Sequence, residues 1–588
     1  MKSFMTQKDD LQLRLEQFSG LQAHAPQKGG SGARELLNLR CMADGTLARR
    51  DGVRVLVQLP EMLRGAVWDA VNSLIYAAAG LHVYKVFQTE QGDYTWEMIG
   101  ELQSSQGPVE FFALENSLIL MDGSTMYSLT PTVAAPLTPY IPLYGKDWSS
   151  VSSTTVYEPK NALTDQVHIR YLAKERLYTL RLSLRPLSVD AMYRNGVLME
   201  ASEYKHYDGT GDISFTTAQE SGNVFDLIVT LPSDSEAQRI REDFFRCRCA
   251  VRPGEVGRTV ALFGNSGEKG VLYISSELSA EQRELCHIVA PQAVMLYVNA
   301  EGKRELGDGT QSIRGIVKHY DRILIMTDKG SWTTDKQRLL GNSGEEVFLA
   351  VNSTLGCTTH GGAISVGNNP ISICGSDLLM WNADTDELNE CNAQSMATKV
   401  RSLLPAKMGD RGRIYYDSKH DEVVFYMPGE ATPSLVYQRA LQCWTTFGYA
   451  GHTLRGLFSM GSTTGILLDD TVCMLDASLP GDLDVMGISQ PIICRFASHD
   501  LCFAHQGASV RPYAVLVCAD AEAGQKMQLM LRAAGGKVVT ASLQATGETP
   551  CEMQKRVSVG RCRHARLELQ CDCLGDFTLG LICVAVGI

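Results

Sequence analysis

The sequence predicts an all-β protein: a β-propeller with an inserted β-sandwich domain and a further β-rich region at the C-terminus. Three observations lead to this fold class. Glycine is abundant, at 53 of 588 residues, and helical periodicity is scarce. Apolar runs of about four to seven residues end in Gly, Asn, Asp or Ser, as strands joined by tight turns do. Hairpins of this kind recur at steps of 42 to 52 residues, the spacing of propeller blades.

The first elements are expected to be an extended N-terminal arm over residues 1–34 and the first part of the propeller over 35–139. Hairpins such as 117–129, with Asp122-Gly-Ser at the turn, supply the propeller strands. A blade is a four-stranded sheet with two apolar faces. It must therefore stack on neighbouring blades, and the ring of blades must close.

The blade spacing breaks over residues 140–250. Alternating apolar and polar residues in 167–171 and 177–184 indicate a β-sandwich inserted into the ring. Capping boxes predict two short helices, one opened by 233–236 over residues 237–245 and one opened by 279–282.

The propeller is expected to resume over residues 251–490, where hairpins such as 371–381 return at the same spacing. Residues 491–588 then contain strand patterns such as 513–518 and 579–586. This C-terminal β region either closes the ring or forms a second sandwich.

The composition excludes several classes of protein. The chain has 54 Lys and Arg against 66 Asp and Glu, a net charge of −12. This acidic balance opposes tight non-specific binding of nucleic acid, which needs a basic face. No stretch approaches the roughly 18 uncharged apolar residues that span a bilayer, and residues 1–16 lack the apolar core of a signal peptide. We therefore expect no membrane insertion, and retention in a cytosol or release by lysis.

Seventeen cysteines are spread from Cys41 to Cys583, too sparsely for a disulfide scaffold. We expect reduced, buried, structural thiols. The pairs Cys247-Arg-Cys and Cys571-Asp-Cys could share a strand face, but structural zinc sites use wider ligand spacing. No metal site is therefore predicted.

No motif indicates catalysis or a cofactor. Residues 264–270 resemble a phosphate loop, but Lys269 precedes Gly270 and then a strand, whereas the Walker pattern needs Ser or Thr after the lysine and a helix. The carboxylates in turns 208–212 and 307–309 lack calcium-loop spacing. Since no Gly-x-Ser-x-Gly elbow occurs either, we predict no catalytic, cofactor-binding or metal residues.

A basic cluster of Arg49, Arg50 and Arg54 is the candidate contact for phosphate or for an acidic partner. The alternative is a solvated or ion-paired surface, which would contribute little to binding.

The order of several segments resembles the tail nozzle, or packaged-DNA stabilisation (tail hub), β-propeller proteins of short-tailed phages. The segments that carry this resemblance are 18–21, 35–40, 44–52, 264–275, 323–330, 355–357, 371–377, 420–426, 435–438 and 443–447. They cover most of residues 18–450.

The resemblance implies a structural virion protein of a tailed bacteriophage and not an enzyme. It implies a homo-oligomeric, hexameric ring below the portal and adaptor that retains the genome and conducts it during DNA ejection. The implied partners are the portal, the adaptor and other tail proteins, with weak non-specific contact with viral double-stranded DNA. The implied location is the virion tail, and the host cytoplasm during assembly. A net-acidic ring suits a conduit, because it lets DNA slide.

Two other classes stay open. A carbohydrate-active β-propeller enzyme should bring carboxylates and aromatic residues together at one end of the ring, yet aromatic residues make up only 7% of the chain. A cellular propeller interaction scaffold should show cleaner repeats than these.

Overall fold

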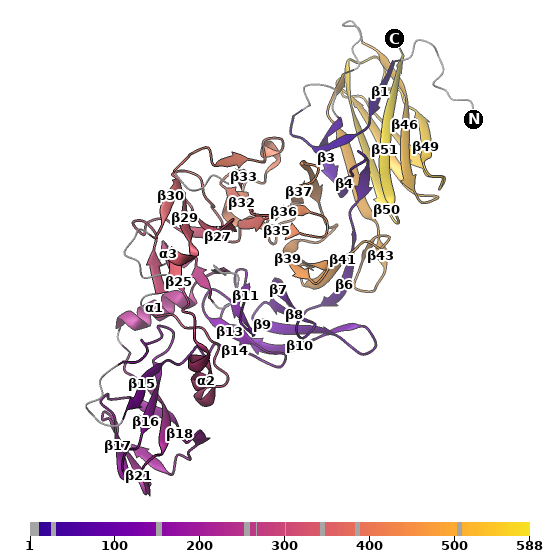
Figure 1. Ribbon diagram of the computed structural model, residues 1–588. Helices are drawn as coiled ribbons and strands as arrows, with labels where there is room; N and C mark the ends of the chain where they lie inside the picture. Colours follow the sequence, from indigo (N-terminus) through magenta and orange to yellow (C-terminus); the bar gives the residue numbers. More distant parts are fainter. Residues whose placement is uncertain are drawn as a thin grey trace.

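The computed structural model is almost entirely β, with 53% of residues in strands and 6% in helices. It describes residues 11–24, 31–148, 156–233, 235–251, 259–265, 267, 269–299, 302–340, 347–382, 388–502 and 509–587. The predicted fold class is confirmed: a β-propeller carries an inserted β-sandwich and a C-terminal β region (Figure 1). None of the described helices is long and apolar enough to cross a bilayer.

The described residues form seven four-stranded blades. The two blades before the insertion are blade 1, with β7 (Leu63–Asp69), β8 (Leu74–Ala79), β9 (His82–Gln88) and β10 (Tyr94–Glu101), and blade 2, with β11 (Glu110–Leu114), β12 (Ser117–Met121), β13 (Met126–Leu129) and β14 (Ala134–Pro136). The next three are blade 3, with β23 (Cys249–Val251), β24 (Ala261–Phe263), β25 (Val271–Ile274) and β26 (Lys303–Glu305); blade 4, with β27 (Ile313–His319), β28 (Arg322–Thr327), β29 (Ser331–Asp335) and β30 (Leu349–Asn352); and blade 5, with β31 (Ala363–Val366), β32 (Asn369–Cys374), β33 (Asp377–Trp381) and β34 (Ala393–Ser395). The last two are blade 6, with β35 (Arg413–Asp417), β36 (Glu422–Tyr426), β37 (Ser434–Gln438) and β38 (Cys443–Phe447), and blade 7, with β39 (Leu454–Met460), β40 (Thr463–Leu468), β41 (Thr471–Asp476) and β6 (Gly52–Gln58). The short helices α3 (Lys336–Leu340), η2 (Arg401–Leu403) and α4 (Met408–Arg411) connect strands of blades 4 to 6.

A strand from the N-terminal part of the chain closes the ring. β6 pairs antiparallel with β41, with Val53 opposite Leu475, and so becomes the fourth strand of blade 7. The first strands of the blades contact one another in the order β7, β11, β23, β27, β31, β35, β39 and again β7. Hydrogen bonds between residues far apart in sequence therefore join the two ends of the ring.

The propeller core lies between the blades, and β8 shows how the sequence produces it. Every residue of its Leu-Ile-Tyr-Ala-Ala-Ala sequence is buried. Ile75 and Ala77 pack in the apolar cluster shared with blade 7, whereas Leu74 and Tyr76 pack in the cluster shared with blade 2. Because successive strand residues point to opposite faces, a strand covered on both faces reads as a continuous apolar run.

A β-sandwich is inserted between blades 2 and 3. Its strands are β15 (Leu143–Trp148), β16 (Gln166–Leu172), β17 (Leu177–Arg181), β18 (Ser188–Arg194), β19 (Val197–Leu198), β20 (Tyr204–His206), β21 (Asp212–Gln219) and β22 (Val224–Thr230). They form the sheets β15-β16-β22-β18-β19 and β17-β21-β20. The two sheets share one apolar core, in which the rings of Phe215 and Phe225 stack at 5.1 Å.

Two helices flank this insertion. α1 (Ser235–Phe245) begins two residues earlier than the predicted helix over 237–245. α2 (Ala280–Val289) begins at the predicted capping box, which is confirmed: the Gln282 amide donates to Ser279 Oγ (3.2 Å), and the Ser279 amide donates to Gln282 Oε1 (2.6 Å).

The C-terminal region forms a second sandwich together with N-terminal strands. The N-terminal strands are β1 (Leu11–Leu15), β2 (Phe18–Leu21), β3 (Ser31–Leu37), β4 (Leu39–Cys41) and β5 (Leu47–Arg49). The C-terminal strands are β44 (Ile492–Ser498), β45 (Leu501–Cys502), β46 (Arg511–Ala521), β47 (Lys526–Ala533), β48 (Val538–Gln544), β49 (Cys551–Arg556), β50 (His564–Cys573) and β51 (Phe577–Gly587). A small hairpin of β42 (Asp482–Leu483) and β43 (Ser489–Gln490) precedes β44. β3 also pairs with β38, so one sandwich sheet and blade 6 form a continuous 11-stranded sheet.

The structure corrects the predicted boundaries. The expected N-terminal arm, 1–34, contributes strands to the C-terminal sandwich, since β1 pairs with β51; residues 1–10 and 25–30 lie outside the described residues. Residues 35–51 also belong to that sandwich and not to the propeller, which begins at Gly52. At the other boundaries, the inserted sandwich ends with β22, the propeller resumes with β23, and its last blade strand, β41, ends before residue 490. The two sandwiches lie on different sides of the propeller (Figure 1).

Candidate functional site

The structure does not bring the three predicted arginines together as an open basic surface. Arg50 is buried, and its guanidinium pairs with both carboxylate oxygens of Asp482 (2.7 and 2.9 Å). Arg49 donates to the Leu479 carbonyl (3.0 Å), and Arg54 pairs with Asp476 (2.6 Å). Their interpretation as a phosphate contact is therefore wrong for Arg49 and Arg50, because these guanidinium groups are used inside the protein.

A buried ionic network lies next to them, where β4 meets the β35–β36 hairpin. Arg40 donates to Glu422 from Nε (2.7 Å) and Nη2 (3.2 Å), and to Asp51 from Nη1 (3.1 Å). His420 lies 2.7 Å from Asp417 through Nδ1 and 3.1 Å from Asp51 through Nε2. Ligand atoms of Asp417, His420 and Glu422 lie within 4.8 Å of one another, but Arg40 and His420 already occupy these carboxylates. We therefore interpret the group as an ion-pair network.

The protonation equilibria in this network are coupled. Burial favours the neutral acid, but the hydrogen bond from His420 and the charge of Arg40 hold the pKa of Asp51 well below its usual range. Burial likewise opposes the charge on Asp417, yet the bond from His420 lowers its pKa. Burial also disfavours the imidazolium, but the two carboxylates raise the pKa of His420. The arrangement favours a protonated histidine between two ionised carboxylates.

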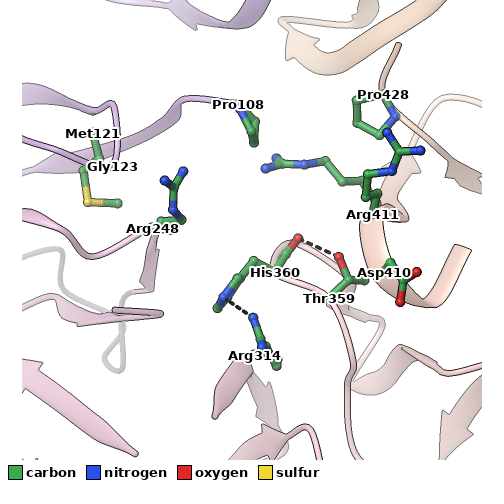
Figure 2. A pocket seen from close by; sticks show the side chains of 11 residues that line it. Pro108, Met121, Gly123, Arg248, Arg314, Thr359, His360, Asp410, Arg411 and Pro428 are labelled. Carbon is green, nitrogen blue, oxygen red and sulfur yellow. Dashed lines mark hydrogen bonds between the residues drawn. The ribbon is translucent and has the colours of Figure 1, made fainter. Parts of the chain in front are cut away.

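A second candidate site is a cavity of about 270 Å³ lined by residues of several blades, here called the axial cavity. It is lined by Pro108, Met121, Gly123, Arg248, Arg314, Thr359, His360, Asp410, Arg411, Arg413 and Pro428. These residues come from blades 2 to 6 or from the segments that lead into them. Figure 2 shows Arg248, Arg314 and His360 on one side of the cavity, with Asp410 and Arg411 across it.

A repeated local structure places one of these arginines. The sequence apolar-Arg-Gly opens the first strands of blades 1, 4 and 7, at 63–65, 313–315 and 454–456. In each strand the register shifts across the arginine, which is the extra residue of a β-bulge. A bulge redirects the extra side chain. In blade 1, Arg64 donates to the backbone carbonyls of Gly80 and Gln106, whereas Arg314 of blade 4 lines the axial cavity.

Arg248 reaches the cavity because position 123 is a glycine. A Cβ atom at Gly123 would lie 2.7 Å from Arg248 Cζ, and the positive φ of +81° also favours glycine there. The Asp122-Gly-Ser turn, predicted from sequence as a hairpin connection, thus also supports an arginine of the next blade.

His360 is held neutral between these arginines. Arg314 Nη1 lies 2.6 Å from His360 Nε2, so Nε2 accepts and Nδ1 carries the proton, 3.6 Å from Cys249 Sγ. Burial, together with the charges of Arg314, Arg248 and Arg413, lowers the pKa of His360 to about 3. Burial is the largest cause of this shift, and the three nearby guanidinium charges add to it.

Only some of the arginines that line the axial cavity have a carboxylate partner. Arg411 pairs with Glu430, and Arg413 lies 3.7 Å from Glu110. Asp410 is the carboxylate that lines the cavity itself. Among the residues that the structure describes, no carboxylate forms an ion pair with Arg248 or Arg314.

The cysteine pairs occupy apolar surroundings. Cys247 packs in the cluster between blades 2 and 3 and Cys249 in the cluster between blades 3 and 4, so the two thiols do not face one site. Cys571 and Cys573 lie in the core of the C-terminal sandwich. Burial raises the pKa of Cys249 to about 12, as expected for thiols that pack and do not react.

No family model matches the chain, and no curated protein matches it. Solved structures similar to it include PorZ, a surface component of the type-IX secretion system of Porphyromonas gingivalis, at 11% identity and a TM-score of 0.35, covering 86% of this chain and 46% of PorZ. The chain thus spans about half the length of PorZ. The Pan2 WD40 domain of Neurospora crassa (8% identity, TM-score 0.34) is covered over 96% of its length by 72% of this chain. The Dos1 propeller (9% identity, TM-score 0.33) is covered over 93% by 78% of this chain.

Proposed function

We propose that the chain is a structural protein of a tailed-bacteriophage virion, a tail nozzle that forms a ring below the portal and adaptor and retains and conducts the genome. The positions of the resembling segments support this proposal. The segments 323–330, 371–377 and 420–426 each cover the second strand of a blade, either with the turn that follows it or with the turn that precedes it. The resemblance therefore follows the repeating unit of the fold and not unrelated stretches.

The observation that carries the proposal is a pair of separate exposed apolar surfaces. The hairpin surface consists of Val485, Met486 and Ile488 in the turn between β42 and β43, with Met486 83% exposed. The insertion surface consists of Val197 and Leu198, which form β19 at the edge of the inserted sandwich and are both exposed. β43 and β18 lie on different sides of the propeller (Figure 1). Exposed apolar groups of this kind mark contact surfaces.

Two different surfaces on one chain suit a cyclic ring. In a heterologous, head-to-tail contact, one surface of each subunit meets the other surface of its neighbour, and the ring closes when the rotation fits. The hairpin surface is well fixed for such a contact, because Asp484 Oδ1 accepts hydrogen bonds from the amides of Met486 and Ile488, each at 2.9 Å. We therefore assign the neighbouring subunit of the ring to this surface.

The ring would make only weak contact with DNA. The Arg49 side chain is 5% exposed and donates to a backbone carbonyl, and Arg50 is buried and paired with Asp482, so neither adds phosphate contacts to a channel. The net charge of −12 per chain then leaves contact with double-stranded DNA weak and non-specific. The ring would reside in the virion tail, after assembly in the host cytoplasm.

The test uses particles of the phage that encodes the chain. Met486→Asp places a charge in the hairpin surface, and Val71→Asp is the matched control, because Val71 is a single exposed apolar residue, 91% exposed, on blade 1. We expect quantitative mass spectrometry of purified particles to find the wild type and Val71→Asp in equal amounts and Met486→Asp depleted. Particles that contain no copies of the chain, or equal amounts of both variants, would refute the proposal.

A further inference from the structure

The axial cavity brings together four arginines, two of which form no ion pair with a described carboxylate. Arg411 and Arg413 each have a carboxylate partner, Glu430 and Glu110, and Asp410 supplies one more negative charge. The carboxylate of Asp122, next to Gly123, accepts hydrogen bonds from the amides of its own turn and forms no ion pair with a described arginine. Arg248 and Arg314 form no ion pair with any described carboxylate. Guanidinium groups crowded in this way repel one another unless an anion lies between them.

The directions of the donors favour a tetrahedral anion over a planar one. The guanidinium groups arrive from three places in the ring: Arg248 before β23, Arg314 on β27, and Arg411 at the end of α4 (Figure 2). A carboxylate offers two oxygens in one plane, whereas a phosphate offers oxygens in several directions to separate guanidinium forks. Converging donors from different blades therefore fit a phosphate.

The size of the cavity limits the ligand. At about 270 Å³ it is smaller than the ~300–1,000 Å³ sites that hold drug-sized molecules. A phosphate ion or a small phosphomonoester suits this volume, whereas a DNA duplex does not.

We propose that the axial cavity is a binding site for a phosphate group, held by Arg248 and Arg314 with support from Arg411 and Arg413. The group arrives either as inorganic phosphate or as the phosphomonoester of a nucleotide. This site does not depend on the virion role proposed above, because it lies within one chain.

Isothermal titration calorimetry of the full chain with inorganic phosphate, at constant ionic strength, tests the site. Arg314→Met and Arg248→Met keep the length of the side chain and remove its charge. Arg54→Met is the matched control, since Arg54 is an exposed arginine paired with Asp476 outside the cavity. We expect binding to weaken at least about tenfold in each cavity variant and to stay unchanged in the control.

The melting temperature distinguishes an arginine that binds phosphate from one that only stabilises the fold. In chloride, Arg314→Met should melt higher than the wild type, because one of the repelling charges is gone. Phosphate should raise the melting temperature of the wild type but not that of the variant. Gly123→Ala provides a variant that keeps every charge: its Cβ displaces Arg248, so phosphate binding should weaken although the net charge is the same.

Titration with adenosine monophosphate and with citrate separates the ligands. Tighter binding of the nucleotide than of phosphate would identify a phosphomonoester as the source, and equal or weaker binding would identify free phosphate; both support the site. Citrate bound more tightly than either would overturn the assignment of a phosphate group. So would phosphate affinity that is unchanged in Arg248→Met and Arg314→Met, or a Kd above about 10 mM in the wild type.

Discussion

Replacing Arg40 by methionine should destabilise the junction between blade 6 and the C-terminal sandwich. The Arg40 side chain is 9% exposed and that of Glu422 is 1% exposed, so water cannot replace the lost partner of Glu422. Arg40 makes three charge-assisted hydrogen bonds, two to Glu422 and one to Asp51. Its guanidinium also lies 5.1 Å from the centre of the Phe447 ring.

The expected loss in the free energy of unfolding is about 3–5 kcal/mol, the range for removing one partner of a buried ion pair. Adding the three bonds separately at about 1.5–3 kcal/mol each would give about 4.5–9 kcal/mol, most of which lies above this range. We use the range of about 3–5 kcal/mol and not the larger sum, because Asp51 keeps its contacts to His420 and Lys419 after the substitution.

Urea denaturation followed by tryptophan fluorescence measures the effect. Trp444 is buried in β38, a strand that contacts β4, and reports on this junction. Arg54→Met is the control, because the Arg54 side chain is 43% exposed, and loss of such an exposed pair costs about 1 kcal/mol or less. The double variant Arg40→Met/Glu422→Met removes the stranded carboxylate and should recover more than half of the loss. A loss below about 1 kcal/mol in Arg40→Met, or a double variant as unstable as the single one, would refute the reasoning.

Three further predictions follow from the same structure. Native protein should react quickly with a thiol reagent only at Cys391 and Cys502, the exposed cysteines, whereas denatured protein should yield all 17 thiols; a larger fast phase would contradict this. Because the pKa of Asp51 is lowered, its carboxylate stabilises the fold above about pH 4, and this contribution is lost as the pH falls. Because the pKa of His420 is raised, its imidazolium stabilises the fold below about pH 6.5, and this contribution is lost as the pH rises. The melting temperature of the wild type should therefore exceed that of His420→Gln by most between about pH 4 and 6.5, and a difference that grows above that window would be contrary evidence. Duplex DNA should bind with a Kd no better than about 10⁻⁴ to 10⁻⁶ M and weaken with salt, and Arg50→Met should not change it; nanomolar, sequence-selective binding in a filter assay would show that the chain reads DNA.

The strand content and the insertion could be predicted from the sequence because they depend on local patterns. Short apolar runs with turn residues specify strands, and the change from blade spacing to alternation marks the insertion. The origin of the closing strand could not be predicted. The partner of β6 is β41, more than 400 residues away, and β1 pairs with β51 at the other end of the chain. Strand pairing over such distances is decided by burial and register in the folded state, which no local pattern encodes.

The candidate functional sites could not be predicted from local sequence patterns either. Arg49 and Arg50 are adjacent in sequence, but Arg49 ends β5 whereas Arg50 lies in the connection to β6, and each guanidinium has its own partner. The axial cavity takes Arg248, Arg314 and Arg411 from three parts of the ring. The repeated apolar-Arg-Gly at 63–65, 313–315 and 454–456, however, is a pattern from which the position of Arg314 could have been predicted.

The proposed function requires this propeller to form a ring in a phage tail. A three-dimensional reconstruction of the phage particle by electron cryo-microscopy, focused on the tail axis, tests it most directly. We expect density below the adaptor in which six copies of the seven-bladed propeller fit, with the β42–β43 hairpin of each copy against the inserted sandwich of its neighbour. A tail axis with no density for this propeller, in particles of the phage that encodes it, would contradict the account.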